Sequence, residues 1–160
     1  MVNRSVRNRI LLAGLVTLAV LGVCLAVTGG ESGPEAAPHA RDAACGAAAG
    51  KLPDKIAGLE RDHTDVAGAA VWGGGKIVAR CGIPMPAKTP DACATVNGVD
   101  WVWHYGQGGD GRDLLVTYGR SPGLEVTVQR GAPSDAALVE LTKAASALPR
   151  HRKCLDSQGT

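Results

Sequence analysis

The sequence contains no phenylalanine, and its aromatic residues are limited to three tryptophans and two tyrosines. It has no cysteines spaced as C-x-x-C, which excludes a thioredoxin-like redox motif. It also lacks the close cysteine pair with which a structural zinc site usually begins. Neither a nucleophile elbow, G-x-S-x-G, nor a complete phosphate-binding loop occurs, so the sequence indicates neither of these enzyme classes.

The chain also lacks a strong charge of either sign, with 17 Lys and Arg against 15 Asp and Glu. Three of the bases are Arg4, Arg7 and Arg9, and the rest of the chain holds 14 bases and 15 acids. Nucleic-acid binding requires a basic stripe, which is missing here. The one basic cluster, Arg150-His151-Arg152-Lys153, is typical of a solvated terminal segment.

An uncharged and mostly apolar run, residues 10–27, follows the three arginines. As a helix it would span about 27 Å, close to the thickness of a hydrocarbon core. The positive-inside rule then places residues 1–9 in the cytoplasm and the chain after residue 27 outside it. We expect a single-pass anchor in the plasma membrane. A cleaved signal peptide, which would release a secreted domain, and a lipoprotein acylated at Cys24 are alternatives.

Three further segments follow the apolar run. Residues 28–41 are rich in Gly, Pro, Ala and Glu and have no large apolar residue, which indicates a flexible linker. One extracytoplasmic domain is expected over residues 42–156, a common domain length, with a tail at residues 157–160. The core of this domain would consist mainly of small side chains, which bury little area each. Covalent cross-links would therefore contribute much to its stability.

The hydrophobic periodicity of the domain predicts a helix, then several strands, then a second helix. We expect the first helix over residues 42–52 and the last from Ser134, with Ser134 as its cap, to Pro149. Apolar runs that flank turn sequences predict three hairpins: residues 66–72 with 76–80, 95–96 with 99–100, and 114–118 with 124–129. This order predicts an α+β fold, in which an antiparallel sheet carries the terminal helices on one face and a transmembrane helix precedes it.

Several stretches of the outer domain form a recognisable combination. They are Cys45 with Leu52-Pro53, residues 70–73 and 77–82, Cys93 with residues 96–101, Tyr118-Gly119-Arg120 with Glu125-Val126, and Cys154. Together they resemble a family of small actinobacterial proteins defined as a domain of unknown function. The resemblance implies an N-terminally anchored envelope protein, but no activity and no catalytic residue. Gly75 departs from the family pattern, in which we expect a proline.

The outer domain has an even number of cysteines: Cys45, Cys81, Cys93 and Cys154. Outside the cytoplasm such a set predicts two disulfides, for which three connectivities are possible. We expect Cys81–Cys93, because the two residues bracket a short proline-rich connection. We expect Cys45–Cys154, because the ends of a domain often lie close together.

An aromatic stripe is predicted on one strand, where Val99, Trp101, Trp103 and Tyr105 alternate with other residues. One interpretation is core packing, since a domain without phenylalanine must bury its few large side chains. The other interpretation is an exposed binding face made of Trp101, Trp103 and Tyr105, suited to a glycan or a partner.

The segment Asp62-His63-Thr64-Asp65 combines a histidine with carboxylates, as acid–base catalysis or metal binding would require. It lacks a second histidine and a placed nucleophile. A single calcium-repeat match at residues 108–115 lacks the stacked neighbours that calcium coordination needs. We therefore expect no catalytic residue, no metal and no cofactor.

The sequence thus favours a non-catalytic, membrane-tethered extracytoplasmic domain. Its expected partners are a protein, glycan or lipid of the cell envelope and not nucleic acid. The alternative is an extracytoplasmic hydrolase or metal-dependent enzyme that uses His63 with Asp62 and Asp65. A third class is a purely structural accessory subunit.

Overall fold

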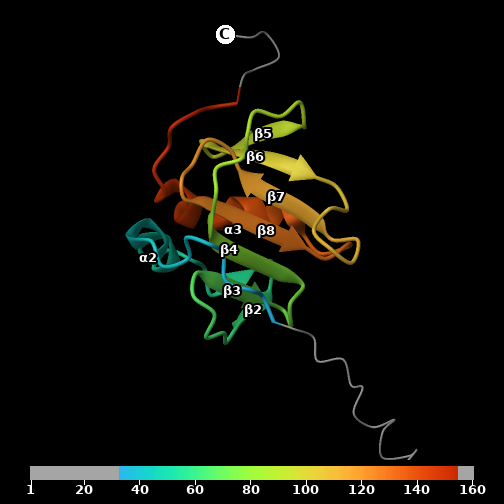
Figure 1. Cartoon of the computed structure of the whole chain (residues 1–160). Coiled ribbons are helices and arrows are strands. Elements are labelled where there is room, and N and C mark those ends of the chain that lie inside the picture. The colour runs from blue at the N-terminus through green and yellow to red at the C-terminus, as the bar shows by residue number, and fades with distance from the viewer. Residues whose placement is uncertain (1–32, 155–160) are drawn as a thin grey trace, which may run out of the picture. The chain divides into compact units, whose positions relative to one another are not determined.

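One antiparallel sheet of eight strands organises the computed structural model, which describes residues 33–154 (Figure 1). The strands are β1 (Lys55–Ile56), β2 (Leu59–Asp62), β3 (Ala69–Trp72), β4 (Ile77–Ile83), β5 (Cys93–Val96), β6 (Val99–His104), β7 (Asp113–Thr117) and β8 (Gly123–Val128). Their spatial order is β1-β2-β3-β4-β8-β7-β6-β5. Strands β4 and β5 are consecutive in the chain, yet β8, β7 and β6 separate them in the sheet.

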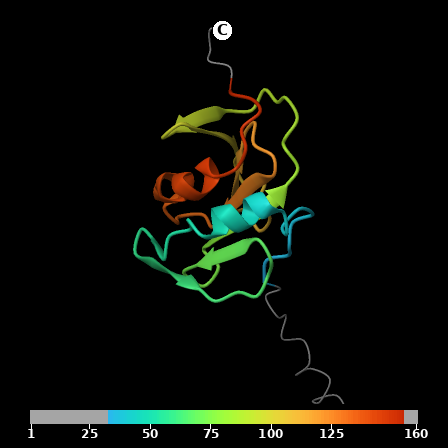
Figure 2. The ribbon, with the colours of Figure 1, turned by 90° about the vertical axis from the view of Figure 1, so that its left-hand side faces the viewer.

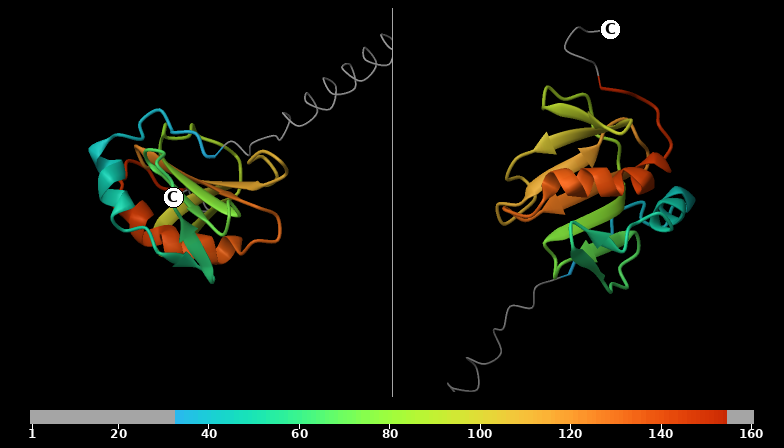
Figure 3. Two further views of the ribbon diagram at one scale, coloured as in Figure 1. Left: turned by 90° about the horizontal axis from the view of Figure 1, so that it is seen from below. Right: turned by 180° about the vertical axis from the view of Figure 1, so that it is seen from behind.

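Two helices, α2 (Ala43–Ala49) and α3 (Ser134–Ser146), lie over the same face of the sheet (Figures 2 and 3). Asp42 caps α2, since its carboxylate accepts a hydrogen bond from the backbone N–H of Ala44 at 3.0 Å. The predicted α+β fold with both helices on one face is confirmed for the described residues. The predicted capping of α3 by Ser134 is wrong. The carbonyl of Pro133 already accepts the N–H of Ala137, so the cap position falls one residue earlier and has no side-chain cap.

The main core fills the space between the helices and the sheet. Its largest buried side chains are Trp72, Trp101, Ile56, Ile77, Leu115, Leu124, Leu141 and Leu148. On β8, Leu124, Val126 and Val128 point into this core and alternate with half-buried Glu125 and Thr127. This alternation has the period of two that one covered sheet face requires. The predicted apolar stripe of the last helix is likewise buried, from Leu138 to Leu148.

Part of the opposite face of the sheet is covered by the chain that precedes α2 (Figure 3). Ala37 and Ala40 pack there against Ile83 and Val116. This corrects the predicted flexible linker, because its described part, residues 33–41, contributes buried side chains. The reason is steric, since small side chains allow the segment to approach closely. The N–H of His39 donates to the carbonyl of Gly82 at 2.9 Å, and a Cβ at Gly82 would collide with the backbone of Ala40.

The three predicted hairpins are confirmed as β3–β4, β5–β6 and β7–β8. Asn97 and Gly98 have positive φ angles of 48° and 79°, as a two-residue hairpin turn requires. Strands β1 and β2 were not predicted, because neither has a run of apolar residues long enough to indicate a strand. No helix within residues 33–154 is long and apolar enough to span a membrane. The predicted membrane helix at 10–27 and the tails at 1–9 and 157–160 lie outside the described residues.

Candidate functional site

The four cysteines of the outer domain form two disulfides, but in a different pairing from the one expected. Cys45 bonds to Cys81 and Cys93 bonds to Cys154, with Cα–Cα distances of 5.6 and 6.3 Å. The insertion of β8, β7 and β6 between β4 and β5 explains the error. Four strand spacings separate Cys81 from Cys93 by about 19 Å, far beyond the roughly 7 Å that a disulfide can bridge.

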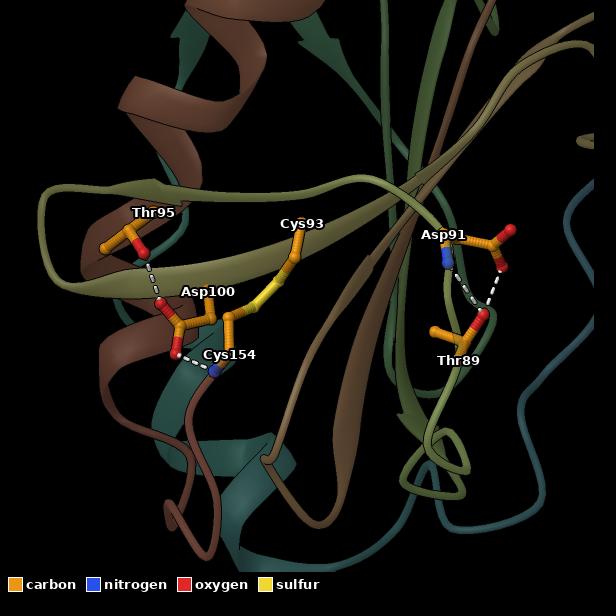
Figure 4. The surroundings of a disulfide bond; sticks show 6 residues. All are labelled: Thr89, Asp91, Cys93, Thr95, Asp100 and Cys154. Carbon is orange, nitrogen blue, oxygen red and sulfur yellow. Dashed lines mark hydrogen bonds between the residues drawn. A yellow bond between two sulfur atoms is a disulfide. The ribbon is translucent and has the colours of Figure 1, made fainter. Parts of the chain in front are cut away.

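The Cys93–Cys154 disulfide anchors the end of the described chain, residues 149–154, which we name the C-terminal strap (Figure 4). The strap lies along the connection between β7 and β8. Gly119 accepts the backbone N–H groups of His151 and Arg152 at 2.7 and 3.2 Å, and the N–H of Ser121 donates to Pro149. Gly119 has a φ of 69°, and a Cβ there would collide with the backbone of Arg152.

Asp100, at the start of β6, is a buried carboxylate beneath the end of the strap. One carboxylate oxygen accepts the hydroxyl of Thr95 at 2.6 Å, and the other accepts the backbone N–H of Cys154 at 3.0 Å (Figure 4). Buried charges require such compensation, because desolvation of an unpaired carboxylate is costly. Asp100 therefore links the β5–β6 hairpin to the strap next to the disulfide.

Arg120, whose backbone forms a β-bridge with Arg150 of the strap, carries a buried guanidinium. Its Nη1 donates to the carbonyl of Leu148, while its Nε has no partner within the described part of the chain. Burial lowers the pKa of Arg120, the positive charge of Arg150 lowers it further, and Asp100 raises it. The strap thus brings a second cation close to a buried one.

An aromatic pair lies at the opposite end of β6. The rings of Trp103 and Tyr105 stack with their centroids 5.3 Å apart and their planes at 23°. Trp103 is half-buried against the main core, whereas Tyr105 is 70% exposed. Trp101 is fully buried, so the core interpretation of the stripe holds for Trp101, and only Tyr105 and part of Trp103 reach the surface.

The chain that follows Tyr105 exposes polar side chains. The connection from β6 to β7 carries Gln107 and Asp110 on its surface. Two contacts hold this connection in place. The carboxylate of Asp113 accepts the N–H of Gly106 at 3.0 Å, and Arg112 donates to the carbonyl of Gly75. Tyr105 thus precedes a connection that is held at two points and exposes an amide and a carboxylate.

The predicted histidine–carboxylate segment does not form a cavity site. His63 Nε2 lies 3.2 Å from Asp65 Oδ1, and the His63 side chain is 88% exposed. Asp62 points elsewhere and accepts the N–H of Gly74 at 2.7 Å, which supports the β3–β4 turn. Among residues 33–154, no group of three or more His, Cys, Asp or Glu is placed to hold a metal ion.

Two other features are the partly buried His104 and a surface hollow. His104 Nδ1 lies 3.3 Å from Asp91 Oδ2, which connects β6 to the proline-rich chain before β5.

The hollow has a volume of about 630 Å³ and is lined by residues 34–42 with Val66 and Ala67. Its wall is formed by mostly exposed residues, and it contains neither His104 nor His63.

A family comparison covers almost the whole chain. Residues 10–153 match the family described as "Protein of unknown function (DUF3515)". The chain belongs to this family. No curated protein and no solved structure matches the chain.

Sequence reasoning did not identify Asp100 or Arg120 as buried charges. Asp100 follows the Asn97-Gly98 turn and reads as an ordinary hairpin residue. Strand alternation places Asp100 on the face opposite to the core residues Val99 and Trp101, which predicts an exposed side chain and gives no signal of its burial. The partner of Asp100, Cys154, is 54 residues away in the chain, and only the fold brings the two together.

Proposed function

We propose that this DUF3515 domain is a non-catalytic binding module, held outside the cytoplasm by the apolar segment at residues 10–27. Its proposed ligand is a saccharide of the cell envelope. The two disulfides support the location, because such bonds persist in oxidising compartments. The basic residues that precede the apolar segment support the orientation.

The observation that carries this proposal is the stacking of Tyr105 on Trp103. The half-buried indole fixes the exposed phenol ring in one orientation before any ligand arrives. A side chain that is already ordered loses little conformational freedom on binding, so its contact energy is retained as affinity. A flat exposed ring, followed in the chain by exposed Gln107 and Asp110, suits a sugar, whose C–H face covers the ring while its hydroxyls bond to amide and carboxylate groups.

The binding test uses the full chain in detergent and sediments it with purified cell-wall polysaccharide. The wild-type protein is expected to co-sediment, and Tyr105→Ala is expected to bind about tenfold more weakly, a loss of about 1.4 kcal/mol. Val139→Ala is the matched control, since Val139 is the other large apolar side chain exposed in the described residues, at 53%. Equal binding by wild type and Tyr105→Ala, or failure of the wild-type chain to co-sediment, overturns the saccharide assignment.

The location has a separate test. Alkaline phosphatase fused after Thr160 is expected to be active, because that enzyme needs an oxidising compartment to form its own disulfides. An inactive fusion, together with a domain that protease cannot reach in intact cells, contradicts the outward placement. Release of an active fusion into the medium supports the outward placement and contradicts the anchor.

A further inference from the structure

The two disulfides differ sharply in solvent access. Cys45 and Cys81 are 1% and 4% exposed and belong to the main core. Cys93 is exposed on β5, the outermost strand, and Cys154 is only half-buried. Breaking a disulfide by exchange requires a thiolate to reach one of its sulfur atoms. In the folded domain, an external thiol can therefore reach Cys93–Cys154 but not Cys45–Cys81.

The accessible disulfide holds a short surface element. Apart from it, the C-terminal strap is held by four hydrogen bonds: those from the N–H groups of His151 and Arg152 to Gly119, from the N–H of Ser121 to Pro149, and from the N–H of Cys154 to Asp100. Residues 150–153 are all exposed. Segments with few buried contacts open locally at a free energy far below that of global unfolding. Loss of the covalent bond would leave the strap only these few hydrogen bonds.

The buried disulfide holds a different part of the domain. Cys45 lies in α2 and Cys81 in β4, and their bond joins the helix to the centre of the sheet. Neither residue contributes to the strap or to the β5–β6 hairpin. The main core therefore stays cross-linked when Cys93–Cys154 is open.

We propose that Cys93–Cys154 is a thiol–disulfide exchange site for an external dithiol, and that its reduction releases the C-terminal strap while the domain stays folded. This site is separate from the proposed saccharide surface, because Cys93 pairs with Val102 and strand alternation places it on the sheet face opposite to Trp103. Release frees four consecutive residues, Arg150 to Lys153, from the surface of the domain and uncovers the Asp100 carboxylate.

The exchange takes place in two steps. A thiolate of the dithiol attacks Sγ of Cys93, forming a mixed disulfide, and Cys154 leaves as a thiolate that takes up a proton. The second thiolate of the dithiol then attacks the dithiol sulfur that is bonded to Cys93. Cys93 leaves as a thiolate and is protonated. The dithiol ends as a disulfide, and the protein has gained two electrons and two protons as two thiols.

The first experiment measures which disulfide reacts. In the oxidised full-length chain, free thiols, including that of Cys24, are first blocked with N-ethylmaleimide. Dithiothreitol is then added under native conditions, and the new thiols are alkylated and mapped by mass spectrometry. Cys93 and Cys154 are expected to be labelled together, at least about tenfold faster than Cys45 and Cys81. Equal rates, or reduction of either disulfide only in denaturant, overturn the exchange site.

Hydrogen exchange of the partly reduced protein tests the release of the strap. The amides of His151, Arg152 and Cys154 are expected to exchange at least about tenfold faster than in the oxidised protein, while that of Val126 in β8 is unchanged. A Cys93→Ser/Cys154→Ser variant should show the same pattern without reductant. Unchanged protection of the three strap amides in the reduced protein overturns the release.

A glycine pair provides a matched control. Gly119→Ala pushes the strap away, whereas Gly74 has a similar φ of 66° with no atom within 4 Å of an added Cβ. Gly119→Ala is expected to speed the reduction of Cys93–Cys154 several-fold relative to Gly74→Ala. Equal reduction rates in the two variants contradict the coupling between the docked strap and the reduction of this disulfide.

Discussion

The carboxylate of Asp100 accepts the backbone N–H of Cys154 at 3.0 Å, across 54 residues of sequence. A buried acid at the start of β6 thus holds the end of the described chain beside the Cys93–Cys154 disulfide. The same carboxylate accepts a hydrogen bond from the hydroxyl of Thr95 and interacts favourably with the nearby positive charge of Arg120. This arrangement makes Asp100 the central polar residue of the strap region.

Asp100→Asn is expected to lower the free energy of unfolding by about 1–3 kcal/mol, because an amide cannot accept on both of its side-chain atoms and leaves a buried donor unpaired. Urea denaturation measures the change. Thr95→Ala is the control, since it removes one hydrogen bond from an exposed residue and should cost less than Asp100→Asn. A smaller loss for Asp100→Asn than for Thr95→Ala would contradict the central role of Asp100.

Trp101→Ala is expected to destabilise the domain by about 3–5 kcal/mol, because a fully buried indole leaves a large cavity. Trp101→Phe should cost much less, since it keeps most of the ring and removes an indole N–H that has no partner in the described structure. Thermal unfolding of both variants provides the measurement. If Trp101→Ala melts like the wild type but loses saccharide binding, the indole belongs to a binding face and its assignment to the core is wrong.

Gly82→Ala is expected to detach residues 33–42 from the sheet, because the new Cβ would meet the backbone of Ala40. Gly75→Ala is the matched control, with a positive φ of 87° and no atom within 4 Å of the added Cβ. Positive φ alone costs an alanine about 1–2 kcal/mol, and the collision at Gly82 should add about 1–3 kcal/mol. Equal losses for the two variants in urea denaturation would show that the packed segment contributes nothing to stability.

Arg150→Gln is expected to raise the free energy of unfolding by about 0.5 kcal/mol at low salt, because it removes a positive charge close to buried Arg120. The gain should shrink as salt screens the interaction. Urea denaturation at two salt concentrations measures it. Arg152→Gln, which removes the same charge two residues further on, controls for the net charge of the strap. Equal gains in both variants would assign the effect to net charge and not to Arg120.

Much of the fold was predictable because its signals are local. The Asn97-Gly98 turn, the alternation along β8 and the apolar stripe from Leu138 to Leu148 each depend on residues a few positions apart. The candidate site was less predictable. The exposed stack of Trp103 and Tyr105 and the buried Trp101 come from one stripe with one periodicity. What distinguishes them is where the covering helices end, and this is a property of packing.

The sequence by itself determined the fold class, the hairpins, the even set of four cysteines and the family. These features depend on composition, turn chemistry and hydrophobic period, which act within short stretches of chain. The tertiary structure alone decided the disulfide pairing and the packing of residues 33–41. Both depend on the pairing of β4 with β8, strands whose partners Arg80 and Glu125 lie 45 residues apart. Because β8, β7 and β6 lie between β4 and β5, Cys93 is at the sheet edge and Cys81 is in the centre. The pairing of distant strands depends on how the whole core is buried, and this cannot be predicted from any short stretch of the sequence.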